Sequence, residues 1–176
     1  MEHIEGIPMI NLGDIPLQGW QLFFKRAFDM VFSLIGLILL FPLLVIIALV
    51  VKTTSRGPVF YTQKRIGLDG KQFKMIKYRT MVTDAEKETG PIWSPANDHR
   101  VTKIGRLLRK FSIDELPQLF NVLIGNMSLV GPRPEIPELL PYYGAAADRV
   151  LAVKPGITSL AKLIGRDHFT FEQTLR

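Results

Sequence analysis

The chain has 176 residues, of which 47% are hydrophobic, and its 22 Lys and Arg against 16 Asp and Glu give a formal charge of +6. This length allows one modest domain beside a membrane segment. The absence of cysteine excludes disulfides, thiolate nucleophiles and Cys-based zinc sites, and the three histidines lie far apart, so a bound metal would be a hard ion held by carboxylates. The basic excess predicts an anionic membrane surface or a phosphate-bearing ligand as partner.

Residues 1–24 are predicted to form a lead-in followed by an interfacial segment. Glycines and prolines are scattered through the first 20 residues without a clear period. Trp20, Phe23 and Phe24 then stand next to the basic pair Lys25 and Arg26. Aromatic residues interleaved with cations are typical of a chain entering the membrane interface.

Residues 25–52 are predicted to form a membrane helix. The uncharged run from Met30 to Val51 is about 22 residues long, or roughly 33 Å as a helix, which is enough to cross a bilayer. Pro42, near its middle, removes a backbone donor and favours a break. A helix that breaks there and returns would keep both basic flanks on one face of the membrane. The composition leaves this re-entrant helix and a kinked spanning helix both open.

Residues 53–176 are predicted to form the domain outside the membrane, and the fold class expected for the whole chain is α+β, mostly helical. Leu68-Asp69-Gly70-Lys71 is a hairpin signal between a strand at 59–62 and a return strand at 73–81. The hairpin carries a concentrated positive patch, which consists of Lys64, Arg65, Lys74, Lys77 and Arg79.

Three helices are expected after a polar loop at 83–98. Apolar residues at helical spacing between Val101 and Phe111, with Lys and Arg on the other faces, predict a basic amphipathic helix suited to anionic lipid or phosphate. A second helix begins near Ser112 and stops at Gly125-Asn126. A third is expected from Pro137 to Val153.

Asp114 and Glu115 are the strongest candidates for chemistry, and two readings compete for them. In the structural one they begin the second helix, either as a capping box with Ser112 or with Asp114 itself as the cap. In the functional one they are a nucleophile and a metal ligand, and Arg109 and Arg133 neutralise a phosphate for attack. On the residues alone the structural reading is favoured.

Other phosphate and hydrolase motifs are missing from the sequence. It contains no G-x-x-x-x-G-K-[ST], no G-x-G-x-x-G and no G-x-S-x-G pattern. The charge gives weak support to nucleic-acid binding, but the membrane segment and the carboxylate pair argue against such a partner.

Several motifs in order resemble the monotopic polyprenyl-phosphate phosphoglycosyltransferases, a family of bacterial sugar transferases. The resemblance runs from about Lys25 to Arg166 and changes the reading of Asp114-Glu115 to the functional one. The motifs that carry it are Lys25-Arg26-Ala27-Phe28-Asp29, Lys77-Tyr78-Arg79-Thr80-Met81, Ser112 to Leu119 (SIDELPQL), Gly125 to Glu135 (GNMSLVGPRPE) and Lys154-Pro155-Gly156-Ile157-Thr158.

This resemblance implies transfer of a sugar-1-phosphate from a UDP-sugar to undecaprenyl phosphate, with release of UMP, at the start of lipid-linked glycan or polysaccharide synthesis. It implies Asp114 as the nucleophile that forms a phosphosugar-enzyme intermediate, and Glu115 as its partner in binding Mg²⁺ or handling a proton. The phosphate-contacting residues that it implies are Arg109, Arg133 and Arg166, with Lys77 and Arg79 as weaker candidates. It favours a re-entrant helix broken at Pro42, with the protein on the cytoplasmic face of the bacterial inner membrane. The sugar is not specified, and a homo-oligomer is left open.

The sequence departs from the family pattern in three places. Phe41 stands before the proline where a small residue such as Ser is common, and residues 159–164 replace the usual Gly-Trp-Ala-Gln run and the polar residue after it. A further C-terminal helical segment is expected in the family, so the chain is expected to be truncated there, while its N-terminal part matches the minimal form without extra membrane spans. Two other functions remain as alternatives: a non-catalytic module that binds a membrane surface, and a hydrolase of polyprenyl diphosphates.

Overall fold

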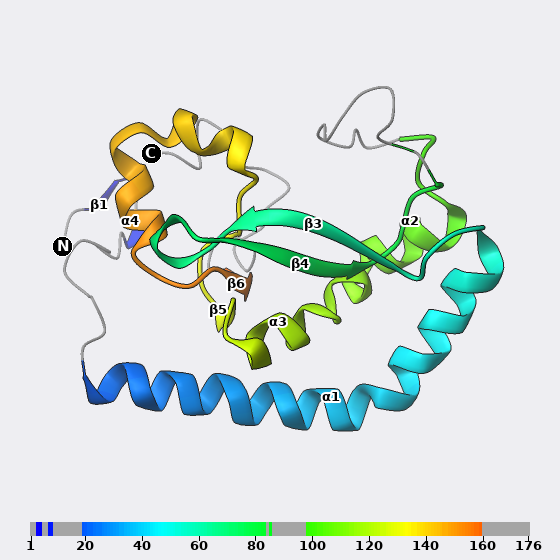
Figure 1. Cartoon of the computed structure of the whole chain (residues 1–176), viewed down its shortest axis with the longest axis horizontal. Helices are drawn as coiled ribbons and strands as arrows, with labels where there is room; N and C mark the ends of the chain where they lie inside the picture. Colours follow the sequence, from blue (N-terminus) through cyan, green and yellow to red (C-terminus); the bar gives the residue numbers. More distant parts are fainter. Residues whose placement is uncertain (1–2, 5–6, 9–18, 84, 86–97, 160–176) are drawn as a thin grey trace.

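The computed structural model describes residues 3–4, 7–8, 19–83, 85 and 98–159 of the chain. Within them, helices and short strands are mixed, as expected for the predicted α+β class (Figure 1). At the N-terminus, β1 (His3–Ile4) and β2 (Ile7–Pro8) form a two-residue antiparallel pair. This pair lies within residues 1–24, for which the sequence predicts a lead-in and interfacial segment and no regular secondary structure.

Helix α1 (Trp20–Thr54) runs along one side of the domain and changes direction in its later part (Figure 1). It begins and ends a few residues outside the predicted 25–52. Pro42 lies within it, and the chain stays helical on both sides of the proline. The predicted break is therefore a bend inside a continuous helix. This helix alone, among the described residues, is long and apolar enough to cross a membrane.

Most of the surface of α1 is apolar and uncovered. Large hydrophobic side chains along its whole length are exposed, and Ile38 and Leu39, at 64% and 73%, are among the most exposed of them. One stripe is buried instead, where Leu37, Leu44 and Val51 join a core cluster with Tyr78 and Leu108. A helix that is apolar all round and only partly covered by protein is suited to a lipid environment.

The predicted hairpin is confirmed. Strands β3 (Phe60–Ile66) and β4 (Gln72–Tyr78) pair antiparallel, and the short 3₁₀ turn η2 (Leu68–Gly70) joins them. Asp69 and Gly70 both have positive φ, 55° and 73°, which is the backbone that the Asp-Gly pair favours. In β3, half-buried Tyr61, Gln63 and Arg65 alternate with exposed residues.

Helix α2 (Lys103–Lys110) lies within the segment predicted to form the first helix of the domain. The Thr102 side chain accepts a hydrogen bond from Gly105 N and caps its start. Leu108 is buried, whereas Leu107 and Phe111 are exposed beside the basic residues Arg106 and Lys110.

The second predicted helix is divided, so its expected start near Ser112 is wrong. A 3₁₀ turn, η3 (Ile113–Glu115), comes first, and α3 (Gln118–Ile124) follows with Pro117 at its N-cap. Neither Ser112 nor Pro117 provides a side-chain cap, so the capping box is not formed. The predicted stop is confirmed, since Gly125 closes α3 in the left-handed region at φ 99°.

Strands β5 (Ser128–Val130) and β6 (Gly156–Thr158) pair in parallel, and the chain between them packs over one end of the hairpin (Figure 1). The third predicted helix is also divided. It consists of a 3₁₀ segment, η4 (Pro137–Ala146), and a short α4 (Ala147–Leu151). Pro141 lies inside η4, and Gly144, at φ 49°, leaves the helical region there. A regular helix cannot continue through the backbone conformation of Gly144, which glycine adopts readily.

Helix α1 is fastened to the same body on both sides of Pro42. Near its start, the Arg26 guanidinium donates to the carbonyls of Val122 and Leu123 at 2.6 and 2.7 Å, at the C-terminal end of α3. Two residues after Pro42, the Leu44 carbonyl accepts from the buried Tyr78 hydroxyl at 2.7 Å. The buried Asn121 amide joins α3 to the outer edge of β4, because it accepts from Ile76 N and donates to the Lys74 carbonyl. Helix, hairpin and α3 therefore hold one another in a fixed arrangement.

Candidate functional site

The carboxylate pair lies at a sharp turn between α2 and α3. Ser112 has φ 55°, a left-handed backbone that non-glycine residues seldom adopt. The turn η3 follows at once and carries Asp114, which is 8% exposed, and Glu115, which is half-buried. Unusual backbone of this kind is more frequent at functional sites than elsewhere.

Lys77 of β4 reaches this pair. Its Nζ lies 3.0 Å from Glu115 Oε1, so the Glu115 side chain forms an ion pair and not the capping contact of the structural reading. Burial raises the pKa of Asp114, and the positive charges of Lys77 and Arg109 oppose that rise. Burial also lowers the pKa of Lys77, which Glu115 opposes. The site therefore brings two carboxylates, Asp114 and Glu115, close to two cationic side chains, Lys77 and Arg109, in partly buried surroundings.

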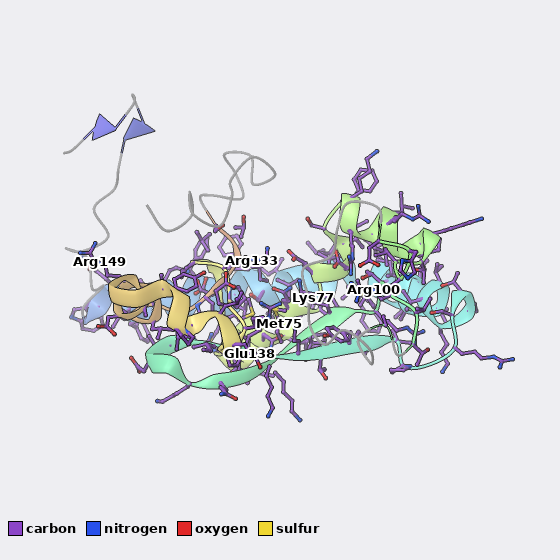
Figure 2. The ribbon with its side chains drawn as sticks, turned by 90° about the horizontal axis from the view of Figure 1, so that it is seen from above. Met75, Lys77, Arg100, Arg133, Glu138 and Arg149 are labelled. Carbon is purple, nitrogen blue, oxygen red and sulfur yellow. The ribbon has the colours of Figure 1, made fainter. Side chains whose placement is uncertain are left out.

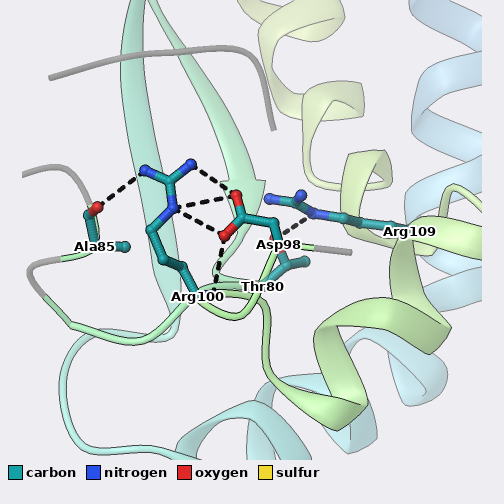
Figure 3. Close-up of polar contacts among 5 residues, drawn as sticks. All are labelled: Thr80, Ala85, Asp98, Arg100 and Arg109. Atoms are coloured by element: carbon teal, nitrogen blue, oxygen red, sulfur yellow. Dashed lines mark hydrogen bonds and ion pairs between the residues drawn. The ribbon is translucent and has the colours of Figure 1, made fainter. Parts of the chain in front are cut away.

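Arg109 is held in place by Thr80, as Figure 3 shows. Its Nε donates to the buried Thr80 hydroxyl at 2.8 Å. Thr80 is itself fixed, because its carbonyl accepts from the backbone N and the hydroxyl of Thr102 at 3.0 and 3.2 Å. The N-terminal end of α2 and its last turn thus both depend on one threonine.

An ion pair that the sequence did not single out lies beside this contact (Figure 3). The guanidinium of Arg100 binds the buried Asp98 carboxylate through Nη2, at 2.6 Å, and through Nε. Its Nη1 donates to the Ala85 carbonyl at 3.1 Å. This pair fastens together the chain before residue 86 and after residue 97.

A pocket opens beside the carboxylate pair, between the hairpin and the turn that carries Arg133. Glu115, Lys77 and Arg133 line it, and Figure 2 places Lys77 and Arg133 in the same central part of the molecule. The lining also includes Arg65 and the buried Gln118. Three cations around one pocket predict an anionic ligand.

The turn that carries Arg133 is fixed by strands β5 and β6. Gly131 N donates to the Thr158 carbonyl at 3.0 Å, and Gly156 N donates to the Pro132 carbonyl at 2.8 Å. A Cβ atom on Gly131 would lie 2.9 Å from Gly156 N, and one on Gly156 would lie 2.7 Å from the Cα of Gly131. The two glycines therefore permit a backbone approach that no other residue allows.

The other predicted site residues lie elsewhere. The guanidinium of Arg79 donates to the carbonyls of Ser55 and Arg56 at 2.8 and 3.0 Å, directly after α1, and these contacts fasten the chain end of the helix to the hairpin. Pro42 lies inside α1. Arg166 falls outside the described residues.

Arg65 and Gln118 are lining residues that the motif reading did not select as ligands. Arg65 was part of the positive patch, and the alternation along β3 could have distinguished it. Arg65 belongs to the half-buried set with Tyr61 and Gln63, whereas Lys64 is exposed. No comparable signal was available for Gln118, whose position depends on where α3 begins.

The described residues contain no cluster of three or more His, Cys, Asp or Glu that could hold a metal. The adjacent Asp114 and Glu115 remain as oxygen donors. Two carboxylates are compatible with Mg²⁺, which keeps several waters and is usually completed by the phosphates of a substrate.

Comparison with known proteins identifies the class to which this fold and site belong. The family model described as bacterial sugar transferase matches residues 20–176, and the chain belongs to that family. The resemblance inferred from the motifs is confirmed.

Individual relatives are more specific in their names. A UDP-glucose:undecaprenyl-phosphate glucose-1-phosphate transferase of Klebsiella pneumoniae is 47% identical over 167 residues, and its Escherichia coli K12 namesake is 43% identical over 168. These alignments cover 93% and 94% of this chain but only 36% of each relative, so the chain spans about a third of their length. The exopolysaccharide production protein ExoY of Rhizobium meliloti is 40% identical over 161 residues, which are 84% of this chain and 71% of that protein.

Proposed function

We propose that this protein transfers a sugar-1-phosphate from a UDP-sugar to undecaprenyl phosphate and releases UMP, as a first step of lipid-linked polysaccharide synthesis. The observation that carries the proposal is the buried Asp114 beside Glu115, next to a pocket lined by Lys77 and Arg133. The names of the relatives support the donor and acceptor classes.

In the first step a carboxylate oxygen of Asp114 attacks the phosphorus that bears the sugar. The bond between that phosphorus and the bridging oxygen breaks, and its electron pair leaves with UMP. An acyl phosphate remains, in which the Asp114 carboxylate oxygen is bonded to the phosphorus that bears the sugar. In the second step a phosphate oxygen of undecaprenyl phosphate attacks the same phosphorus, which forms the lipid diphosphate sugar and returns the Asp114 carboxylate.

The cations would neutralise the phosphate oxygens during both steps. Arg109 and Arg133 suit this role because a planar guanidinium can hold two oxygens at once. Lys77, paired with Glu115, would add a point charge beside the nucleophile. Arg166 is proposed for the same role from the motif alone. Arg79 is not, because its contacts lie at the end of α1.

Asp114 and Glu115 would hold Mg²⁺ together with the donor's phosphates. When bound, the ion would supply charge neutralisation at the diphosphate.

A position on the cytoplasmic face of the inner membrane, with residues 25–52 re-entrant, completes the proposal, and residues 53–176 would form the catalytic domain. Helix α1 contacts the same body at Arg26 and at Leu44, whose carbonyl binds Tyr78. These two positions are about 18 residues apart, which is roughly 27 Å along a helix. A spanning helix would place these two contacts near opposite sides of the hydrocarbon core, which is about 30 Å thick. A bent helix resting in one leaflet keeps both contacts, while exposed Phe111 and Ile124 extend the apolar surface.

Two single-cysteine variants test this topology in a chain that contains no cysteine. Gln21→Cys and Lys52→Cys introduce thiols at exposed positions near the two ends of α1. In intact spheroplasts both should resist a membrane-impermeant maleimide, and both should react after the inner membrane is opened. Labelling of one alone in intact spheroplasts would establish a spanning helix.

Thr80 provides a test of how Arg109 is positioned. Thr80→Val keeps the shape but removes the hydroxyl that accepts from Arg109 Nε. We expect the rate of UMP release to fall about 10-fold, because small misplacements of a charged group cost catalysis heavily. Thr80→Ser retains the hydroxyl and should stay within about threefold of wild type in the same assay. Equal loss in both variants would assign the effect to packing.

The function itself is tested with purified protein, undecaprenyl phosphate, Mg²⁺ and a panel of UDP-sugars. Release of UMP together with a sugar-bearing lipid diphosphate is expected for one preferred sugar, and EDTA should abolish it. Free sugar phosphate as the product would instead indicate the hydrolase alternative. Vesicle binding that weakens with salt, without any turnover, would indicate the non-catalytic membrane module.

A further inference from the structure

Arg65 is a half-buried cation in the same pocket as Lys77 and Arg133. It belongs to β3 and lies on the face of the hairpin shared by Gln63 and Tyr61. Lys64, the next residue, points to solvent on the other face. Two neighbouring cations on one strand therefore have opposite surroundings, and only Arg65 lines the pocket.

Two contacts fix the guanidinium of Arg65. Its Nη1 donates to the Pro134 carbonyl at 3.0 Å, and its Nη2 donates to Gln63 Oε1 at 2.7 Å. The adjacent backbone bond from Ile66 N to the Glu135 carbonyl, at 2.9 Å, ties the end of β3 to the same turn. Arg65 is thus anchored to the residue that follows Arg133, and the two guanidinium groups line the pocket from the strand and from the turn.

The surroundings of Arg65 are unfavourable for a cation that has only a structural role. Its buried Nε has no hydrogen-bond partner among the described residues. Burial and the positive charge of Arg133 lower its pKa, while Glu135 opposes the shift. An apolar side chain would fill the space without desolvating a charge or facing a second arginine. The arrangement becomes favourable once an anion lies between the two guanidinium groups.

We infer that Arg65 is a further donor-binding residue, which together with Arg133 and Lys77 binds the diphosphate of the nucleotide sugar. This inference rests on the proposed function. Two guanidinium groups, one from β3 and one from the turn, match the several oxygens of a diphosphate better than those of a single phosphate. Arg65 therefore contributes to affinity for the donor, whereas Asp114 contributes to the chemical step.

Binding of UDP to full-length protein that carries Asp114→Asn measures this contribution without turnover. Arg65→Gln is expected to raise the Kd for UDP about 30-fold, because charge-assisted hydrogen bonds to the diphosphate are lost. Arg65→Lys keeps the charge but loses the planar fork, and should raise the Kd about fivefold or more. The matched control Lys64→Gln removes the same charge from the solvent face of β3 and should leave the Kd unchanged.

Kinetics in the active background separate binding from folding. For Arg65→Gln we expect KM for the UDP-sugar to rise while kcat stays within about threefold of wild type. A structural role alone would lower the melting temperature and kcat together.

If Arg65→Gln does not fold, Arg65→Lys takes its place, and a wild-type Kd in that variant would overturn the inference. It would also be overturned by equal UDP affinities for Arg65→Gln and Lys64→Gln. If UMP release is normal but Arg65 has no effect, the proposed function stands without it. If the chain binds no UDP at all, both fail.

Discussion

Replacement of Asp114 by Asn is expected to lower the rate of UMP release at least about 10³-fold, because an amide cannot form the acyl phosphate that carries the sugar. The change is close to isosteric and removes the charge from a buried position, 8% exposed. The folded state should therefore lose little stability, since burial already disfavours the charged form and raises the pKa of this carboxyl. Initial rates with radiolabelled UDP-sugar, together with melting temperatures, measure both effects.

Asp69→Asn is the matched control for this substitution. Asp69 lies exposed in the hairpin turn at φ 55°, a left-handed backbone that Asn adopts readily. The same chemical change there should leave the rate within about twofold of wild type. An Asp114→Asn variant that retains a tenth or more of wild-type activity would show that another group is the nucleophile.

The second large effect is expected from Gly105→Ala, which should reduce the stability of the folded protein by about 3 kcal/mol or more. A Cβ atom at residue 105 would overlap the carbonyl oxygen of Thr80 and lie 2.7 Å from its carbonyl carbon. These are backbone atoms that cannot move aside singly, so α2 would have to shift. The shift would also disturb the hydrogen bond from Arg109 to Thr80, and activity should fall with stability.

Gly36→Ala provides the comparison within the same chain. Its new Cβ would meet the tip of the Leu119 side chain at 3.5 Å, an ordinary contact, and alanine favours the helical backbone of α1. Thermal unfolding in detergent should show a clear loss for Gly105→Ala and little change for Gly36→Ala. A Gly105→Ala protein that melts like wild type would contradict the packing of α2 against Thr80.

The sequence predicted the turns and helix ends that depend on the backbone preferences of nearby residues. The Asp69-Gly70 turn, the apolar spacing of α2 and the stop at Gly125 all appear where the sequence indicated. Each depends on backbone preferences within a few residues. The motifs also named residues that the structure brings together, since Glu115, Lys77 and Arg133 line one pocket and Asp114 lies beside Glu115 in the same turn.

Tertiary contacts decided the features that the sequence did not predict. The capping box is not formed, since Ser112 has a left-handed backbone without a side-chain cap and Glu115 pairs with Lys77, a residue 38 positions away. Arg79 looks like a phosphate ligand in its motif, but its guanidinium meets the carbonyls after α1. The packing of the hairpin against the Arg133 turn is what places Arg65 in the pocket. These contacts join residues that are far apart in the sequence, so no local sequence pattern could have predicted them.

The central claim is the covalent step at Asp114, and mass spectrometry of the protein tests it most directly. Protein incubated with UDP-sugar and Mg²⁺, without undecaprenyl phosphate, should gain the mass of one sugar phosphate on the peptide that contains Asp114. Addition of undecaprenyl phosphate should remove that mass and yield the lipid product, and Asp114→Asn should never acquire it. Transfer of sugar phosphate to the lipid with no adduct at any time would contradict the account and indicate direct attack by the lipid phosphate on the donor.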